Sequence, residues 1–458
     1  MSSRTGLLLA RALALAAVPI VLPASNCAKD VGEGDEFGVH TVRVSVDAQG
    51  AQVLANSENV SVSADGRFVA FDSDAPNVAP NDSNGVRDVF VKDRTTGAVE
   101  IVSVNTAFPL FPPFWPSRNP AMTPDGRYVV FESQGSLAAG PGGDGKWRVF
   151  LHDRVLRTTK YVLGRFTDLG DDMFDARISA DGAVIVFTSN SKTVPIPGGG
   201  TYSVPPVTYA PQVYAVSAAQ AGGLIVDITL VSRSTGSPTT GSSNACSNPE
   251  ISANGNAIVF DSSGTNLNAD DVDGQTDVYR GSPAGGLLDL VTLISPGVKA
   301  VGLSGFPTVS ADGNLVAFST TASNVVPGAA SATRQIAMKN MTTGAFTHVS
   351  VDDTGAPANS GCIDPHMTPD GGLVAFNTIA TNLAGPGAAT SDQIVVRDLL
   401  GGTVHASVGS SGAAADSFCL GSFLSADGRW VGWYSGASNL VAGDTNGGND
   451  VFVRGPLR

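Results

Sequence analysis

The sequence predicts an all-β fold, a seven-bladed β-propeller built from four-stranded antiparallel blades. Three observations support this prediction. A stretch of the form Ser63-Ala64-Asp65-Gly66, followed by the apolar run Phe68 to Phe71, recurs seven times. Each copy is followed by further segments of strand-like composition. The last copy ends one strand short, and a strand-like segment at residues 41–46 precedes the first copy, so the two ends can complete one blade.

The recurring stretch is typical of a strand end, a tight turn and a second strand. Its Asp or Asn occurs at positions 65, 125, 181, 254, 312, 370 and 427. Asp-Gly between two apolar runs is a strong hairpin signal, and we expect positive φ at both turn residues. The flanks are rich in Val, Ile and Phe, as buried strands are. Seven copies predict seven hairpins, and six or eight blades fit the count less well.

Two more strands are predicted in each unit. The third strands are expected at residues 88–93, 147–153, 212–216, 277–280, 335–339, 393–398 and 450–454. A turn such as Thr95-Thr96-Gly97 leads to a fourth strand such as Val99 to Val104. Residues 41–46 have the composition of that fourth strand, so they are predicted to close the ring and to remove its open edges. The propeller is then one domain, residues 39–458.

The repeat unit also carries a family resemblance. Ser/Thr-Ala/Pro-Asp-Gly-Arg-x-Val-Ala-Phe, followed by a strand such as Asp88 to Asp93, resembles the WD-like repeats of TolB-type β-propellers. The resemblance extends over the whole chain after its N-terminal segment. The best-known members of that family have six blades, whereas this sequence has seven copies. The resemblance implies an extracytoplasmic binding scaffold, or a propeller of the kind that accompanies hydrolase domains.

Composition excludes one class of partner. The chain has 458 residues, of which 42% are hydrophobic and 15% charged, and its formal net charge is −14. An acidic surface without a basic stripe repels phosphate backbones, so we expect no nucleic-acid binding. Cations or a basic partner fit this charge better. We also expect a monomer that contacts a membrane only through a lipid anchor.

The N-terminus is typical of an export signal. Arg4 and Arg11 flank apolar residues, and the run from Ala12 to Leu22 is short for a membrane span. Residues 1–26 are therefore predicted to be a signal peptide and residues 27–38 a flexible tether. Cys27 is either the lipidated first residue of a lipoprotein or part of a simply secreted chain. Both alternatives place the protein outside the cytoplasm, in the periplasm, at the cell surface or in the medium.

Three acidic loops precede third strands on the face that also carries the blade-to-blade loops. Their Asp-x-Asp/Asn-Gly-x-x-Asp pattern offers oxygen ligands at alternate positions and a Gly for the bend, as calcium loops require. They are similar to the calcium loops of integrin α-chain propellers, but Pro80, Ala269 and Ala442 replace the first acidic residue of that pattern. The alternative is a turn in which these side chains bond their own backbone. The candidate ligands are Asp82, Asn84, Asp88, Asp271, Asp273, Asp277, Asp444, Asn446 and Asp450.

Three cysteines share one repeat position. Cys246, Cys362 and Cys419 each lie six residues before the Ser or Thr of the hairpin motif, where three other copies have Ser and one has Met173. Cys362 and Cys419 fall in adjacent blades, so a disulfide between them is predicted if their Cα atoms approach within about 7 Å. The alternative is a small buried residue in a slot that Ser also fills.

The loop between blades 1 and 2 contains four aromatic residues among prolines, namely Phe108, Phe111, Phe114 and Trp115. A stiff apolar patch on the loop-rich face is a candidate site for a ligand or partner. The alternative is that the loop simply covers the mouth of the channel.

Catalytic motifs are weak in this sequence. No Ser has Gly two residues before and two after it, and the five His show no metal-ligand spacing. His366 lies near the start of an inner strand and could face the channel, or it could be a structural histidine. The sequence therefore favours an exported, non-enzymatic scaffold that binds a protein or glycan through the loop-rich face. The alternatives are a hydrolase or lyase acting on polysaccharide or peptide at the channel mouth, and a calcium-stabilised structural envelope lipoprotein.

Overall fold

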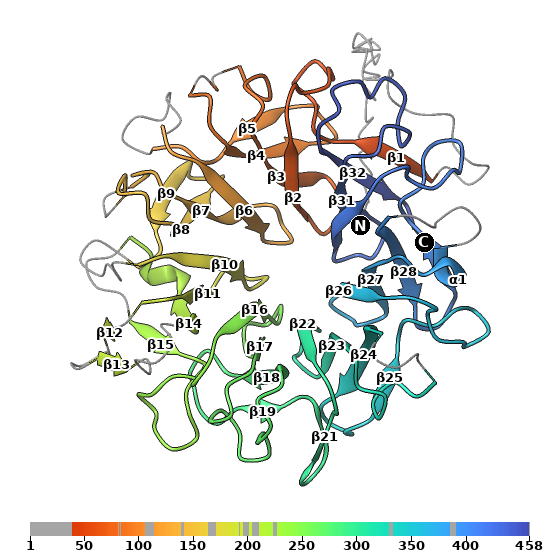
Figure 1. Cartoon of the computed structure of the whole chain (residues 1–458). Coiled ribbons are helices and arrows are strands. Elements are labelled where there is room, and N and C mark those ends of the chain that lie inside the picture. Colours follow the sequence, from red (N-terminus) through yellow and green to blue (C-terminus); the bar gives the residue numbers. More distant parts are fainter. Residues whose placement is uncertain are drawn as a thin grey trace, which may run out of the picture.

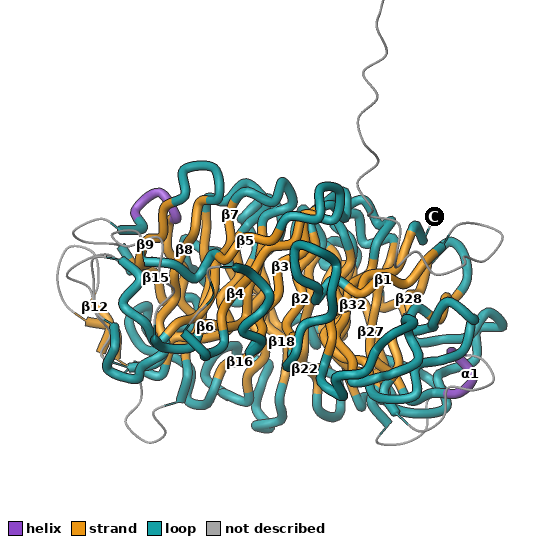
Figure 2. The backbone as a smooth tube through the Cα atoms, turned by 90° about the horizontal axis from the view of Figure 1, so that it is seen from above, coloured by secondary structure: helices purple, strands orange, loops and turns teal. Residues whose placement is uncertain are grey.

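The structure is a closed ring of seven four-stranded antiparallel sheets, as the sequence predicts (Figure 1). It is a computed structural model that describes residues 39–457 except 81, 83, 106–113, 139–141, 164–170, 192, 196–200, 204–209, 223–226, 329–332 and 385–390. Figure 2 shows the ring from the side, with strands running between two faces of loops. No helix among the described residues is long and apolar enough to cross a membrane. The predicted signal peptide, the tether and Cys27 lie outside the described residues.

Each blade contributes one strand to each of four concentric layers. The innermost strands are β2 (Ser57–Val62), β6 (Ser117–Met122), β10 (Met173–Ile178), β16 (Cys246–Ile251), β22 (Ser304–Val309), β26 (Cys362–Met367) and β30 (Cys419–Leu424). The second strands are β3 (Phe68–Ser73), β7 (Tyr128–Ser133), β11 (Val184–Ser189), β17 (Ile258–Ser262), β23 (Leu315–Thr320), β27 (Leu373–Thr378) and β31 (Val431–Ser435).

The third layer consists of β4 (Asp88–Asp93), β8 (Arg148–Asp153), β14 (Gln212–Ser217), β18 (Asp277–Gly281), β24 (Gln335–Asn340), β28 (Gln393–Asp398) and β32 (Asp450–Gly455). The outermost strands are β5 (Val99–Ile101), β9 (Thr158–Tyr161), β15 (Ile228–Leu230), β19 (Asp289–Leu290), β25 (Phe346–His348), β29 (Thr403–His405) and β1 (His40–Arg43). Small additions are the hairpins β12 (Thr193–Pro195) with β13 (Thr201–Ser203) and β20 (Leu293–Ser295) with β21 (Val298–Lys299), the 3-10 turn Ala218–Gln220 and the one-turn helix α1 (Thr381–Ala384).

The N-terminal strand closes the ring. β1 pairs antiparallel with β32, with Val42 opposite Val453, and becomes the outermost strand of blade 7. This confirms the predicted closure, although the strand ends at Arg43 rather than at residue 46. One more bond follows the strand, from the Val44 N–H to the Val451 carbonyl, and Val46 then forms an isolated bridge with Gln52 in the loop that leads to blade 1.

The hairpin turns differ in one respect from the prediction. Gly66 has φ +72°, but Asp65 does not have positive φ, so only the glycine needs the left-handed region. The Asp65 carboxylate instead accepts bonds from the Ser63 hydroxyl at 2.8 Å and the Arg67 backbone N–H at 3.0 Å. The repeated acid is therefore a turn cap, and it lies on the face opposite the blade-to-blade loops.

Aromatic pairs fill the interior of several blades. Phe71 and Phe90 are fully buried with ring centroids 5.9 Å apart, and Trp433 and Phe452 repeat the pair at 6.0 Å. The aliphatic side chains around these rings form clusters that extend from one blade to the next. This burial stabilises the ring and holds the inner strands in fixed positions around the channel.

Candidate functional site

A bulge distorts every inner strand at the same point. The register between β2 and β3 shifts between Glu58 and Ser61, and the other six blades show the equivalent shift. The third residue of each inner strand has φ between +51° and +66°: Asn59, Asn119, Asp175, Asn248, Phe306, Asp364 and Gly421. Bulges redirect side chains. All seven residues line one cavity in the channel.

This cavity, which we call the channel-mouth cavity, has a volume of about 410 Å³ and lies in the half of the channel nearer the blade-to-blade loops. Its wall also includes Arg177, Glu250, His366, Asn377, Leu420, Ser422, Phe423 and Tyr434. A smaller, more apolar cavity of about 130 Å³ lies nearer the Asp-Gly turns, where Pro124, Ala180, Ala253, Ala311, Pro369 and Ala426 line it. Polar chemistry is therefore concentrated toward the loop-rich face.

An ion pair forms part of the wall of the channel-mouth cavity. Arg177 Nε lies 2.6 Å from Glu250 Oε1 and joins β10 to β16. Burial raises the pKa of the nearby Asp364 carboxyl to about 6, although the Arg177 charge opposes the rise. The cavity thus has three carboxyl groups, of Asp175, Glu250 and Asp364, around one guanidinium.

His366 both faces the channel and is hydrogen-bonded within the ring. Its Nδ1 accepts a bond from the backbone N–H of Leu424 at 3.1 Å, and its ring lies 4.1 Å from that of Phe423. Burial, with a further contribution from the Arg177 charge, lowers the pKa of His366 to about 3. The neutral tautomer therefore carries its hydrogen on Nε2.

Polar side chains of the cavity wall have fewer of their hydrogen bonds made in blades 6 and 7 than in blades 1, 2 and 4. Asn59 Nδ2 donates to Asp72 at 2.8 Å, and Asn119 and Asn248 make the same bond to Glu132 and Asp261. Blade 6 has Asn377 at the Asp72 position, and its Oδ1 is buried without a hydrogen-bond partner among the described residues. The same holds for Ser422 Oγ in blade 7. Buried polar atoms normally have partners, so these two mark the part of the wall with the fewest hydrogen bonds made.

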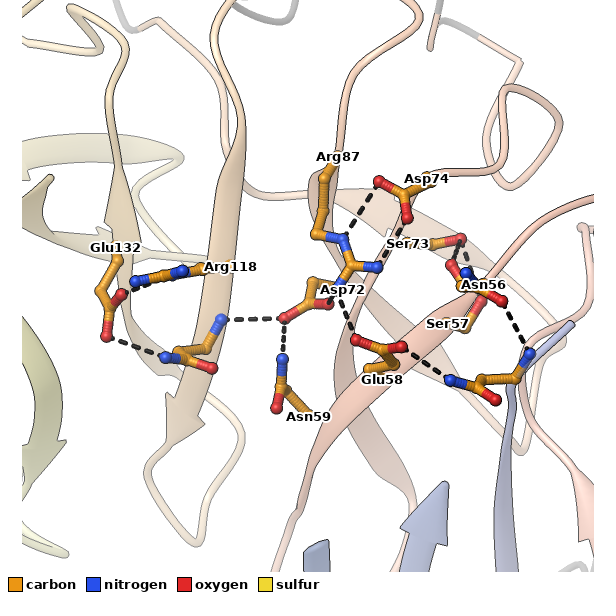
Figure 3. Close-up of polar contacts among 12 residues, drawn as sticks. Asn56, Ser57, Glu58, Asn59, Asp72, Ser73, Asp74, Arg87, Arg118 and Glu132 are labelled. Carbon is orange, nitrogen blue, oxygen red and sulfur yellow. Dashed lines mark hydrogen bonds and ion pairs between the residues drawn. The ribbon is translucent and has the colours of Figure 1, made fainter. Parts of the chain in front are cut away.

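Arginine clusters hold the rim of blades 1 and 2 (Figure 3). Arg87 contacts Glu58 at 2.7 Å, Asp72 at 2.9 Å and Asp74 at 2.6 Å. Burial nevertheless raises the pKa of Asp72 to about 7. Asp72 also accepts a bond from the Asn119 backbone N–H at 2.9 Å, which ties blade 1 to blade 2. The charges and hydrogen bonds of this cluster are satisfied within it, so this side of the mouth is rigid.

The structure brings the candidate metal ligands of blade 4 together. Carboxylate oxygens of Asp271, Asp273 and Asp277 lie within 4.8 Å of one another, so the triad could hold a metal. However, Lys299 Nζ lies among them, 2.9 Å from Asp271 and 2.7 Å from Asp273, and it also contacts Asp277. The carboxylates raise the pKa of Lys299 despite its burial. In this structure the ammonium group takes the position that a metal ion would need.

Blade 7 shows the same arrangement with other partners. Gln52 Nε2 donates to Asp444 at 2.7 Å and to Asp450 at 2.9 Å, and Arg43 lies 3.5 Å from Asp450. Asn446 Nδ2 bonds the Val53 carbonyl instead of the acids.

The blade 1 loop is different. Burial raises the pKa of Asp82, and the nearby Asn84 backbone N–H offsets part of the rise. Asn84 Nδ2 donates to Asp88 at 2.6 Å.

The predicted aromatic patch lies only partly within the described residues. Phe108 and Phe111 fall outside them, whereas Phe114 is 85% exposed and Trp115 is 40% exposed on the loop before β6. Neither Phe114 nor Trp115 lines the channel-mouth cavity. A role for these four residues in binding a partner stays a prediction.

The predicted disulfide is absent from this structure, in which Cys362 and Cys419 are free, buried thiols. Cys362 Sγ lies 3.3 Å from Thr378 Oγ1, and Cys419 Sγ lies 3.4 Å from Ser435 Oγ. Each thiol therefore points into its own blade, as Ser57 does toward Ser73, and not toward its neighbour. Burial raises the pKa of the two thiols to about 12 and about 11.

Comparison with known proteins supports the fold alone. No protein-family model and no curated protein sequence matches the chain. Oligogalacturonate lyase from Vibrio parahaemolyticus is similar at TM-score 0.54 and 10% identity, over 92% of this chain and 95% of that one. A structure of oligogalacturonate lyase in complex with manganese gives TM-score 0.53 and 11% identity, over 92% and 96%.

Two other solved structures are also relevant. The propeller domain of the trilobed protease from Pyrococcus furiosus gives TM-score 0.51 and 10% identity, over 87% of this chain and 95% of that one. TolB from Acinetobacter baumannii is among the structural neighbours, with 16% identity over 64% and 53%, but its TM-score of 0.34 carries no argument about function.

The sequence did not single out most residues of the channel-mouth cavity. Arg177, Glu250 and His366 occupy one repeat position, the fifth of the inner strand, where other blades have Ser61, Ala121, Thr308 and Phe423. The signal was a departure from the repeat, because two charged side chains and a histidine interrupt a position that is otherwise small or apolar. Aligning the seven units and comparing that position could have found them.

Proposed function

We propose that the chain is an exported, non-enzymatic binding propeller that holds a short neutral or amino-sugar glycan in the channel-mouth cavity. One observation carries the proposal: the cavity of about 410 Å³ has buried polar atoms without partners, Asn377 Oδ1 and Ser422 Oγ, in its wall. Its size falls within the range of small-molecule sites. A hydroxyl-rich ligand would supply the missing hydrogen bonds once these side chains turn toward the cavity, and would so offset the cost of burying these atoms.

The other wall residues fit the same ligand class. Phe306, Phe423 and Tyr434 offer flat apolar surfaces for the carbon-bound hydrogens of a sugar ring. Asp175, Glu250 and Asp364 are acceptors for hydroxyl or ammonium groups. Carboxyl groups outnumber the single guanidinium of Arg177, so a polyanionic sugar such as oligogalacturonate would be repelled. The ligand proposed here therefore differs from the substrate named for the lyase neighbours.

Export is part of the proposal and rests on the composition of residues 1–26. Cys27 is the first residue of the mature chain if the protein is a lipoprotein. Intact-mass analysis of the mature protein distinguishes the two forms, because acyl chains on Cys27 add mass that a simply secreted chain lacks.

The binding experiment compares three oligosaccharide classes by isothermal titration calorimetry: neutral β-glucan fragments, chitosan fragments and oligogalacturonate. We expect the first or second to bind and the third not to bind. Ser422→Ala and Asn377→Leu should each weaken binding about fivefold, because each removes a hydrogen bond worth about 1 kcal/mol. Leu400→Ser, at a fully exposed position on the opposite face, is the matched control and should change nothing. Binding of oligogalacturonate alone, or no binding by any class, would refute the proposal.

A second candidate is a glycan hydrolase or lyase, and the raised pKa of Asp364 favours it. A carboxyl group with a pKa of about 6 beside a second carboxylate, Glu250, has the properties of a general acid. Incubation with a saccharide that binds, followed by mass spectrometry of the sugar, tests this function. Shortened products that disappear in Asp364→Asn would support it, and an intact sugar after prolonged incubation would reject it.

A further inference from the structure

Every blade buries one polar side chain at the first position of its third strand. The seven residues are Asp88, Arg148, Gln212, Asp277, Gln335, Gln393 and Asp450, and each is at most 1% exposed. We call this position the buried slot. A buried polar group is costly unless its hydrogen bonds are made, and a buried charge is costly unless it is paired. The seven slots can therefore be compared by how each one is satisfied.

Neutral slots are satisfied by the loop that leads to the next blade. Gln335 Nε2 donates to the Ala358 and Ser360 carbonyls at 3.3 and 3.2 Å, while its Oε1 accepts from Ser350 Oγ at 2.9 Å. Gln212 and Gln393 make the same set of bonds. Arg148, the only basic slot residue, pairs with Asp144 at 2.6 Å. None of these four slots has an unpaired charge.

The acidic slots of blades 4 and 7 take a positive group from the protein itself. Lys299 pairs with Leu293 in the hairpin that follows blade 4, and from there its ammonium group contacts Asp271 and Asp277. Gln52 bridges Val46 in the equivalent hairpin after blade 7 and donates to Asp444 and Asp450. Arg43 adds a guanidinium there at 3.5 Å from Asp450.

Blade 1 has the same acids and a matching hydroxyl, but the described residues supply no such partner. Ser103 Oγ donates to Asp88 at 2.6 Å, as Ser45 does to Asp450. In blade 7, Arg43 lies opposite Phe452. The equivalent residue of blade 1, opposite Phe90, is the uncharged Ile101. In the segment that corresponds to the Lys299 and Gln52 hairpins, residues 104–116, the sequence contains no Lys, Arg or Gln. Its one amide side chain, Asn105, donates to the Ser136 carbonyl at 2.6 Å.

Arg87, which precedes Asp88 in the chain, does not neutralise the acids of the blade 1 loop. Arg87 directs its guanidinium to Glu58, Asp72 and Asp74, as Figure 3 shows. No basic side chain among the described residues forms an ion pair with Asp82 or Asp88.

Asp82 provides a second, independent observation. It is only 7% exposed, and neither of its carboxylate oxygens has a hydrogen-bond partner of normal geometry among the described residues. It corresponds to Asp271 and Asp444, the acids that bind Lys299 and Gln52, and its charge is close enough to act on Asp88. Two buried carboxylates without a counter-charge destabilise the fold unless a cation binds them or a proton neutralises one of them.

We propose that the blade 1 loop binds one calcium-type divalent cation through Asp82 and Asp88, and that Lys299 and the pair Gln52 and Arg43 replace this cation in blades 4 and 7. Hard oxygen ligands, including the side chain of Asn84, match the preference of Ca²⁺. The predicted set of three calcium loops is thereby reduced to one. This inference is independent of the proposed glycan function.

Calcium titration of the metal-free protein, followed by calorimetry and thermal unfolding, tests the proposal. We expect one Ca²⁺ per chain and a rise in Tm of about 3 °C in saturating Ca²⁺. Asp82→Asn should abolish binding, whereas Asp271→Asn, the matched change in blade 4, should leave the stoichiometry at one. Lys299→Met removes the ammonium group from the blade 4 triad, so we expect it to raise the stoichiometry from one to two.

Stability in chelator separates loss of binding from loss of folding. Asp82→Asn removes an unpaired buried charge, so in chelator it should be at least as stable as the parent protein. No calcium binding by the parent protein, binding retained in Asp82→Asn, or a parent stoichiometry of three would overturn the proposal.

Discussion

Arg177 Nε lies 2.6 Å from Glu250 Oε1, so an ion pair connects blades 3 and 4 in the wall of the channel. The two side chains remain 37% and 24% exposed because the channel cavity adjoins them. The pair is therefore partly screened, and its contribution to stability is closer to that of a surface pair than to that of a fully buried one.

We expect Arg177→Met to lower the free energy of unfolding by about 1 kcal/mol, as for a partly exposed pair. It should also raise the pKa of Asp364 further, because the Arg177 charge now opposes the effect of burial on that carboxyl. Urea denaturation measures the first effect and carboxyl ¹³C NMR the second. A double-mutant cycle with Glu250→Gln isolates the coupling, and a coupling of zero would mean that the two charges act separately.

His366 should make the protein less stable as the pH falls below 6.5. Its folded pKa of about 3 lies below the unfolded value of 6.5, so the unfolded chain binds the proton first. The contribution of the neutral His366 ring to the free energy of unfolding is complete above pH 6.5 and is lost as the pH approaches 3. Thermal unfolding of His366→Gln, whose amide oxygen can still accept the Leu424 N–H, should show a smaller loss between pH 7 and pH 4 than the parent protein. Equal losses in both proteins would show that His366 titrates normally.

Gly66→Ala should be more destabilising than Gly355→Ala. Both glycines have positive φ, +72° and +83°, so both substitutions carry the same backbone cost of about 1 kcal/mol. A Cβ at Gly66 would also lie 2.2 Å from Cδ1 of Trp430 in blade 7, whereas a Cβ at Gly355 would meet nothing within 4 Å. Chemical denaturation of the two variants measures the difference, which reports packing between blades. Equal losses would indicate that Trp430 moves aside freely.

The three buried cysteines should be unreactive in the native protein. Burial raises the pKa of Cys246, Cys362 and Cys419 to between about 11 and about 12, so little thiolate is present at neutral pH. We expect no labelling of these thiols by iodoacetamide under native conditions and complete labelling in guanidinium chloride without reductant. Peptide mapping that recovers Cys362 linked to Cys419 would restore the predicted disulfide.

Much of the fold was accessible from the sequence because its determinants are local. Each Asp-Gly turn and its flanking strands occupy about ten residues, and seven copies were enough to predict seven blades and the closing role of the N-terminal strand. The acidic loops could also be recognised from the sequence. Their ligands lie within seven residues of one another, so the pattern predicts a possible ion site without reference to the rest of the chain.

Only the tertiary structure decided the contacts between segments that are distant in the sequence. Lys299 lies more than twenty residues after the blade 4 loop that it neutralises, and Gln52 reaches Asp450 only because the ring closes. Arg177, Glu250 and His366 converge because three inner strands meet around one axis. The conformation of a turn depends on neighbouring residues, so short sequence motifs predict it. Charge balance and channel chemistry depend on which distant side chains the closed ring brings together.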